Sequence, residues 1–384
     1  MSKKTKIQWC DSTVNPIMGC AGCELYPTPE QLLEFIDRDL INAGHGGWKS
    51  GMASELFEAV LAQAWQELPK VDGEPISDHI NEPTTTNIRH LRDRLGENVA
   101  ESFGAAAGRT AIRAIERNLS CYAAQLHANR GLAIHRPLRK INHGYSPTFE
   151  QVTEFPGRLR TASCWEDMTG KHRPDKPWLN ELARLIFVSD MGDAFSHRAK
   201  FEFLRSEVPA FQGSDGRRHL WLWLTKRPDI MRQFAAEIGG FPSNVCAMTT
   251  VTSTKNLKRI DALRRVDAPV RGLSLEPLWA PIAQKIDLTE IDWVIVGGES
   301  GAKKNVQPFP IEWVRELRQL CLDCGVAFFV KQLGRRPTQS GNRITLRDNH
   351  GGDWGEWPSD LRVREIPEYF RNYSDKHSQD GNRH

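Results

Sequence analysis

The stretch His219-Leu220-Trp221-Leu222-Trp223-Leu224-Thr225 is apolar at every position between its two end residues. A strand buried on both faces has such a continuous apolar run, whereas a half-exposed strand alternates apolar and polar side chains. Strands buried on both faces are typical of parallel sheets that are covered by helices. The run therefore indicates an inner strand of a parallel α/β sheet.

Similar short runs occur on both sides of this stretch, and amphipathic sequence such as 311–321 separates them. Strands that alternate with helices imply a parallel sheet. Together with the segment before Cys20, the runs give eight candidate strands, which suits a TIM-like (β/α) barrel, complete or partly open. An open doubly wound sheet is the alternative fold. The other candidate strands are 149–155, 185–190, 245–251, 270–275, 293–297 and 326–331.

The organisation of the chain differs before and after these runs. Between Leu56 and Trp65, and elsewhere in 29–118, apolar residues recur at helical spacing, with joints rich in Pro, Gly and Asp. We expect residues 1–28 to hold the first strand and the start of a ligand loop, and 29–118 to be a helical insertion. The barrel core would then be 119–336, and 337–384 an extension that frays at its end.

Three cysteines stand where the chain can bring them together. Cys20 and Cys23 lie in Asn15-Pro16-Ile17-Met18-Gly19-Cys20-Ala21-Gly22-Cys23, and Cys121 opens a predicted helix. If the insertion is removed, the three close into one short loop, in which glycine lets the backbone approach a ligand. Three thiolates suit a four-iron cluster that keeps one iron without a protein ligand.

Two other readings of these cysteines remain open. Zinc would need a fourth ligand, for which His127 or His143 is available. A thioredoxin-like redox pair would use Cys20 and Cys23 alone. The remaining cysteines are predicted to be structural, since a reduced cysteine behaves as a small apolar residue: Cys10, Cys164, Cys246, Cys321 and Cys324.

Polar residues and glycines follow one predicted strand after another. In parallel α/β proteins, ligands bind beyond the carboxyl ends of the strands, where loop residues converge. One such residue is ordinary, but a series of them predicts a site. The series is Asp190, Asp193, Thr225, Lys226, Arg227, Thr250, Thr252, Ser253, Ser274, Glu276, Gly297, Gly298, Glu299, Lys331 and Gln332.

The composition excludes some classes of protein. Apolar residues make up 39% and charged residues 26%, as in ordinary globular proteins. The apolar runs are too short to cross a membrane, and no signal-peptide core follows the basic start. We therefore expect a cytoplasmic protein with reduced thiols. The net charge of +3 does not by itself indicate nucleic-acid binding, although the basic runs 135–140 and 217–219 could contact phosphates.

An ordered series of motifs resembles the phage-associated three-cysteine family that is described as radical-SAM-like. The resemblance extends over most of the chain outside the insertion. In the family the cysteines form a compact loop, whereas residues 24–120 separate Cys23 from Cys121 here. The family's function is largely unknown, so the resemblance implies a class of chemistry more than a substrate. The motifs are Asn15–Cys20, Cys121-Tyr122-Ala123, Phe187–Asp193, Leu222–Pro228, Leu273–Pro277, Trp293–Gly301 and Phe329–Gly334.

The resemblance implies an enzyme with a [4Fe-4S] cluster on Cys20, Cys23 and Cys121. Such enzymes bind S-adenosylmethionine (SAM) at the open iron, receive an electron from a donor and cleave SAM to a 5′-deoxyadenosyl radical. The protein would ligate the cluster, orient SAM and exclude water. Because the resembling family is associated with phages, a nucleobase, nucleoside or nucleic acid is the expected substrate.

The strand-end residues supply groups suited to these tasks. Asp190 or Asp193 could bind the SAM ammonium, Lys226 or Arg227 its carboxylate, and Thr252 or Ser274 its ribose. Gly297 and Gly298 could let the backbone approach SAM, and Tyr122 could cover the cluster. The candidates for catalytic roles such as proton transfer are Glu276, Glu299 and Lys331.

Two other functions compete with this one. A zinc-binding module that binds nucleic acid without catalysis would leave the carboxylates at the strand ends unexplained, because they repel phosphate. A Mg²⁺-dependent nuclease or hydrolase could use Asp190, Glu276 and Glu299 as metal ligands, but it would leave the three cysteines unexplained.

Overall fold

The structure is a computed structural model of the 384-residue chain. It describes residues 1–20, 22–26, 29–45, 70–71, 74–75, 92–118, 121–130, 144, 146, 149, 152–196, 201–300 and 306–381. The chain forms two compact units, Met1–Pro16 with Glu154–His384, and Ile17–Thr153. The expected helical pattern between Leu56 and Trp65, the basic run 135–140 and His143 lie outside the described residues. The predicted division at residues 28, 118 and 336 stays a prediction.

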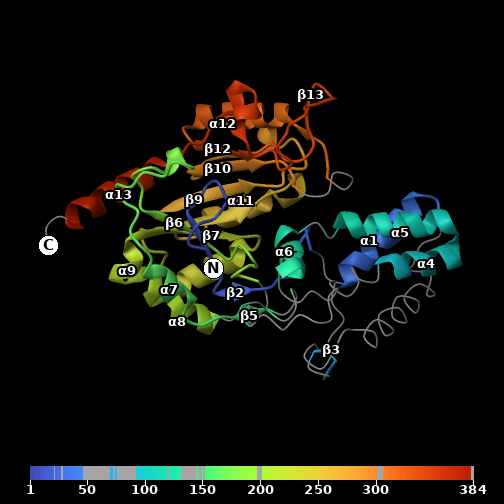
Figure 1. Cartoon of the computed structure of the whole chain (residues 1–384), viewed down its shortest axis with the longest axis horizontal. Coiled ribbons are helices and arrows are strands. Elements are labelled where there is room, and N and C mark those ends of the chain that lie inside the picture. The colour runs from blue at the N-terminus through green and yellow to red at the C-terminus, as the bar shows by residue number, and fades with distance from the viewer. Residues whose placement is uncertain are drawn as a thin grey trace. The chain divides into compact units, whose positions relative to one another are not determined.

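The first unit is built on a seven-stranded parallel sheet, curled into a half-barrel (Figure 1). Its strands follow one another in chain order without reversal. That order is compatible with a partly open (β/α) barrel and differs from a doubly wound sheet, in which the order reverses. The strands are β1 Ser12–Val14, β6 Arg184–Val188, β7 His219–Thr225, β8 Val245–Thr250, β9 Val270–Leu275, β10 Trp293–Gly297 and β12 Ala327–Gln332.

One of the eight predicted strands is absent from this sheet. Among the described residues of the predicted strand 149–155, β5, Thr153–Glu154, is the strand, and it lies in a separate two-stranded sheet with β2, Ile17–Met18. The sequence Phe149-Glu150-Gln151-Val152-Thr153-Glu154-Phe155 is interrupted by polar residues, unlike the continuous apolar runs of the inner strands. The prediction of a strand of the large sheet was therefore wrong here.

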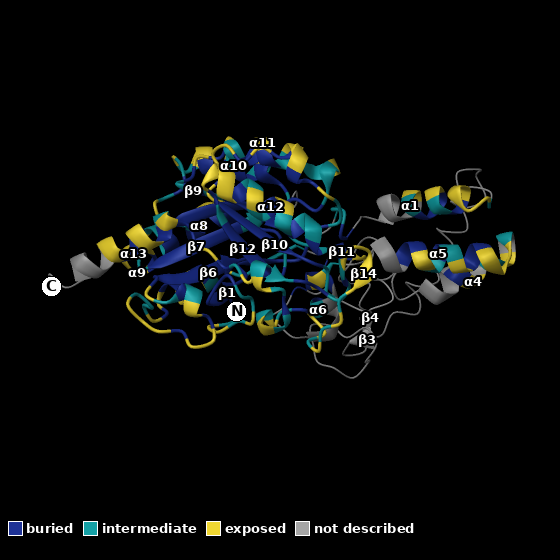
Figure 2. Ribbon diagram, turned by 90° about the horizontal axis from the view of Figure 1, so that it is seen from above, coloured by how far each residue is buried: buried dark blue, intermediate teal, exposed yellow. Residues whose placement is uncertain are grey.

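The two faces of the half-barrel bury different side chains. The inner face carries an apolar core that includes Leu185, Leu222, Met248, Ile295 and Phe329. Helices with one buried and one exposed face cover the outer side (Figure 2). These helices are α7 Arg158–Ser163, α8 Phe201–Gln212, α9 Ser214–Arg217, α10 Pro228–Glu237, α11 Lys258–Arg264 and α12 Ile311–Cys324.

A segment without regular structure lies along the edge strand β12. The Val330 amide donates to the Val363 carbonyl (2.9 Å), and the Glu365 amide donates to the Phe328 carbonyl (2.9 Å). Between them, the Arg364 guanidinium lies over four aromatic rings at 4.1 to 5.7 Å from their centroids. The rings are those of Trp178, Phe329, Trp354 and Trp357.

The residues that precede β1 are held by a buried lysine. The Lys176 ammonium donates to the carbonyls of Thr5 (2.8 Å), Ile7 (2.7 Å) and Cys10 (2.5 Å). Further along the chain, helix α13, Glu368–Gly381, is anchored where the Ala183 amide donates to the Ser374 hydroxyl (2.8 Å). A small sheet of β11 Phe309–Pro310, β13 Pro337–Gln339 and β14 Asn342–Arg343 completes this unit.

The second unit is mainly helical in its described part. It contains α1 Pro29–Asn42, α4 Arg92–Phe103, α5 Ala105–Asn118 and α6 Tyr122–Arg130, with a short hairpin of β3 Lys70–Val71 and β4 Glu74–Pro75. Helices α4 and α5 are in close contact because glycines face each other: a Cβ on Gly108 would lie 2.4 Å from the Gly96 carbonyl oxygen. Helices α1, α4 and α5 all lie within the predicted helical insertion.

Candidate functional site

The inner face of the half-barrel changes from apolar to polar near the carboxyl ends of its strands. Along β8, Cys246 and Met248 belong to the apolar core, and the next inner residue is Thr250. Along β9, Val270 belongs to the core, and Ser274 follows on the same face. Alternate residues of a strand share a face, so one layer of the barrel interior ends in hydroxyl groups.

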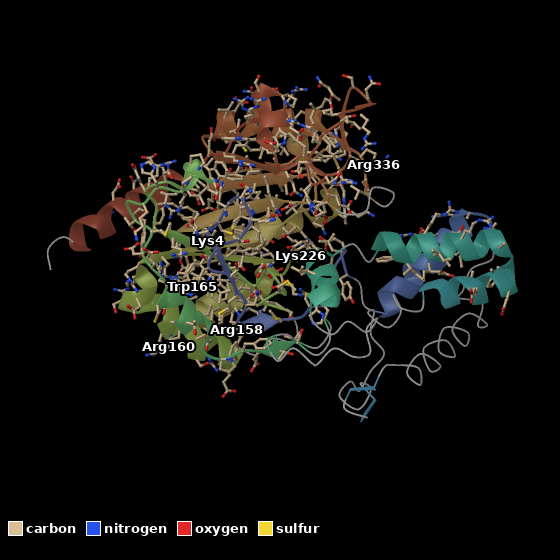
Figure 3. The ribbon with its side chains drawn as sticks, in the orientation of Figure 1. Lys4, Arg158, Arg160, Trp165, Lys226 and Arg336 are labelled. Carbon is tan, nitrogen blue, oxygen red and sulfur yellow. The ribbon has the colours of Figure 1, made fainter. Side chains whose placement is uncertain are left out.

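The neighbouring strands β10 and β12 also change from apolar to polar or glycine residues in this layer. On β10 the core residue Ile295 is followed on its face by Gly297, and on β12 Phe329 is followed by Lys331. Lys226 directly follows β7, beyond the carboxyl end of that strand (Figure 3). The predicted set of strand-end residues is thus brought to one end of the sheet.

An ion pair spans three strands in this layer. The Lys331 ammonium donates to both oxygens of Glu276, at 2.5 and 2.6 Å. Glu276 follows β9 and Lys331 lies in β12, and β10 pairs with both strands. The pair crosses Gly297 of β10, where a Cβ would lie 3.2 Å from Glu276 Cγ. A larger residue at 297 would push against the pair, whose side chains are 17% and 20% exposed.

A second carboxyl group lies beyond β10. Glu299 Oε2 accepts hydrogen bonds from the Trp279 indole (3.0 Å) and the Gln307 amide (3.3 Å). Burial raises the pKa of Glu299, so this group keeps a proton to higher pH than an exposed glutamate. Gly298, beside it, allows close backbone packing, because a Cβ there would lie 2.4 Å from the Leu333 carbonyl oxygen.

Asp190 is placed by the residue that follows β1. The Asn15 side-chain amide donates to Asp190 Oδ1 (2.6 Å), and Asn15 Oδ1 accepts from the Met191 amide (2.9 Å). Burial raises the pKa of Asp190, and the Asn15 hydrogen bond opposes this shift. The preceding residue, Ser189, is buried with φ 67°, a conformation that is uncommon for residues other than glycine. Neither Asn15 nor Trp279 was among the sequence candidates, although each lies within four residues of a strand end.

Two predicted cofactor ligands are engaged in local structure instead. Both oxygens of Asp193 are bonded: Oδ1 accepts from Thr225 Oγ1 (2.7 Å) and Oδ2 from Arg227 Nη1 (2.9 Å). This buried ion pair ties the end of β6 to the end of β7. Thr252 is fully buried, and its hydroxyl donates to Asn256 Oδ1 (2.9 Å) in the turn after β8.

The three cysteine positions are all in the second unit. The Cys121 amide donates to the Leu25 carbonyl (3.0 Å), two residues beyond Cys23. The Cys20 amide donates to the Phe149 carbonyl (2.7 Å). These backbone hydrogen bonds join three segments that are far apart in sequence: the loop of Cys20–Leu25, Cys121 and Phe149. All three cysteines are thiols; Cys20 is buried, and Cys23 and Cys121 are half-buried.

The side chains around this loop are aromatic and polar. The Phe149 ring contacts those of Tyr26 and His127, at centroid distances of 5.1 and 5.9 Å. His127 Nε2 lies 2.8 Å from the Ser146 carbonyl oxygen, so in the neutral ring this nitrogen carries the hydrogen. A metal-binding histidine commonly makes such a bond with its second ring nitrogen, so His127 as a zinc ligand stays a prediction. Tyr122 is 57% exposed.

In the residues that the structure describes, no three His, Cys, Asp or Glu side chains are gathered as a group that could hold a metal ion. The fit of the three cysteines to a cluster therefore rests on the backbone contacts and on the chemistry of three thiols. Elsewhere, Cys10, Cys246 and Cys321 are buried, and burial raises the pKa of each thiol, as expected of structural cysteines. Cys164 and Cys324 are exposed.

The basic run 217–219 lies at the start of β7, the opposite end of the strand from the candidate site. His219 is fully buried with Nε2 3.0 Å from the Ser163 carbonyl oxygen, so it has no surface from which to contact a phosphate. No helix in the described ranges is both long and apolar enough to span a membrane.

The fold is that of a parallel α/β protein in which polar side chains gather at the carboxyl ends of the strands. Residues 100–362 match the family described as "Protein of unknown function (DUF5131)". The match covers more than half of the chain, and the chain belongs to this family. The matched residues include Cys121 and strands β6 to β12, and they begin after Cys20 and Cys23. No significant match was found among curated proteins or among solved structures.

Proposed function

We propose that the chain is a radical SAM-type iron–sulfur enzyme, with a TIM-like, partly open barrel, that modifies a nucleobase, nucleoside or nucleic acid. The observation that carries the proposal is the hydrogen bond from the Cys121 amide to the Leu25 carbonyl. It brings the third cysteine to the loop of the first two, as three ligands of one cluster require.

The cysteine loop would provide cluster ligation. Cys20, Cys23 and Cys121 together supply three thiolates and leave one iron open. When bound, the cluster supplies the electron that cleaves SAM. The burial of Cys20 supports this role, because a buried site limits solvent access to a metal centre.

The strand-end layer of the first unit would bind SAM and the substrate. Asp190 suits the SAM ammonium, and Lys226 suits a carboxylate. Glu299 suits a proton-holding role, because burial raises its pKa. Glu276 and Lys331 already form a donor–acceptor pair through which a substrate proton could be held. A protein electron donor and a cytoplasmic location complete the proposal.

The test is to purify the chain without oxygen and measure iron, sulfide and zinc, then SAM cleavage under reducing conditions. We expect about four irons and four sulfides per chain and release of 5′-deoxyadenosine. Cys121→Ala is expected to lose the iron, while Cys164→Ala, which changes an exposed cysteine of the first unit, keeps it. Equal iron in both variants, a single zinc, or Mg²⁺-dependent cleavage of DNA by iron-free protein would each overturn the proposal.

A further inference from the structure

Two residues on the inner face carry hydroxyl groups in adjacent positions. Thr250 and Ser274 are each 3% exposed. They are register partners on the adjacent strands β8 and β9, so their side chains lie side by side. This layer of the interior therefore holds two adjacent hydroxyl groups, each of which can donate and accept a hydrogen bond.

Their direction follows from the strands on which they lie. Met248, two residues before Thr250, belongs to the inner core, and so does Val270, four residues before Ser274. A Cβ at Gly272, between Val270 and Ser274, would lie 3.1 Å from Met248 Cε. The inner faces of the two strands are therefore adjacent, and both hydroxyls face the interior of the half-barrel.

The ion pair next to these hydroxyls has unused hydrogen-bonding capacity. Glu276 lies two residues beyond Ser274, and Lys331 donates two of its three N–H groups to it. The third N–H of Lys331 has no partner in the described part of the chain, and a carboxylate can accept more than two hydrogen bonds. The pair as a whole is neutral, so it does not favour a charged ligand.

We propose that this layer binds the edge of a neutral lactam or carboxamide, in which a carbonyl and an N–H stand side by side. The third N–H of Lys331 donates to the ligand carbonyl, and the ligand N–H donates to Glu276. Thr250 and Ser274 bond the next polar atoms of the ligand. Uracil-type and hypoxanthine-type nucleobases carry this edge. That the bound base is the substrate rests on the proposed function, whereas the binding itself does not.

The experiment is calorimetric titration of the full chain with uracil and hypoxanthine, with 1,3-dimethyluracil and ribose as matched ligands. Dimethyluracil keeps the carbonyls of uracil but has no N–H. We expect at least one of the two bases to bind, and neither control ligand to bind at the same concentrations. No binding of either base at millimolar concentration, equal binding of dimethyluracil, or binding of ribose alone would overturn the proposal.

Hydroxyl variants separate a ligand site from a structural one. Ser274→Ala and Thr250→Val are expected to weaken binding of the base about tenfold, since each removes a hydrogen bond, and to leave the melting temperature unchanged or higher. The matched control is Thr249→Val. The Thr249 hydroxyl donates to the Thr225 carbonyl (2.9 Å) and lies on the face of β8 opposite to Thr250, so this substitution should lower the stability and leave binding of the base unchanged. Lower stability with unchanged binding in Ser274→Ala would overturn the proposal.

Variants of the ion pair test its part in the site. Glu276→Met and Lys331→Met each remove one partner of the lactam edge and are expected to weaken binding of the base at least tenfold. Cys121→Ala is expected to bind the base as tightly as the wild-type chain does, whatever its iron content, because Cys121 is not part of the lactam site. Loss of iron chemistry and loss of base binding are thereby separate results.

Discussion

The buried imidazole of His219 makes a specific contribution to the pH dependence of stability. His219 lies at the start of β7, and Nδ1 has no partner in the described part of the chain. The pKa of His219 is lowered from 6.5 to about 4, mainly by burial; the Ser163 carbonyl opposes this shift, and the positive charges of Arg184 and Arg218 add to it. Protonation would place a second N–H where it finds no acceptor.

The size of the effect follows from the pKa difference. Between pH 6.5 and 4 the unfolded chain binds a proton at His219 that the folded chain does not bind. The free energy of unfolding therefore falls as pH falls through this window and is constant below it. A shift from 6.5 to about 4 corresponds to about 3 kcal/mol in all.

The assay is urea unfolding of the wild-type chain and His219→Gln between pH 7.5 and 4. Glutamine keeps an N–H that can reach the Ser163 carbonyl but does not titrate. The stability advantage of the wild type over the variant should shrink by about 3 kcal/mol as pH falls. His172→Gln, at an exposed site, is the matched control and should leave the pH dependence unchanged. An advantage that stays constant with pH for His219→Gln would refute the reasoning.

Two further substitutions test contacts that hold the first unit together. Gly298→Ala should destabilise the chain by about 2–3 kcal/mol, because the added Cβ would lie 2.4 Å from the Leu333 carbonyl oxygen. Gly297→Ala is the control and should lower the stability less, because its Cβ would have contacts of 3.2 Å or more. Similar urea midpoints for the two variants would contradict this prediction. Arg364→Leu should lower the stability measured by thermal unfolding by about 2–4 kcal/mol, because it loses the ring contacts and leaves carbonyl groups unpaired. Arg315→Leu is the control: Arg315 is half-exposed, so its loss should lower the stability by under about 1 kcal/mol. Equal losses for the two arginines would show that the ring contacts do not stabilise the fold.

Most of the parallel sheet could be predicted from sequence because its strands are buried on both faces. The predicted strands 219–225, 270–275 and 293–297 have the observed bounds, and others differ by one or two residues. The contacts that lie beyond the two edge strands could not be predicted. Residues 363–365 lie along β12 and Lys176 holds residues 5–10 through backbone groups, which leave no pattern in side-chain hydropathy.

The candidate site was predictable in its location but not in its details. Parallel strands place their carboxyl ends together, so the series from Asp190 to Lys331 lies at one end of the sheet. Which of these residues remains available depends on partners from other strands. Both oxygens of Asp193 are bonded by Thr225 and Arg227, whereas Glu276 is paired with Lys331 and can accept further hydrogen bonds. No local sequence pattern distinguishes these two carboxylates.

The segment at Arg364 has a consequence for anyone who shortens this chain. The family match ends at residue 362, so a chain cut there would keep every strand of the large sheet but lose the backbone bonds that lie against β12. It would also lose Ser374, which accepts the Ala183 amide. An uncovered apolar edge strand pairs readily with other chains, and such a protein would aggregate before its chemistry could be measured.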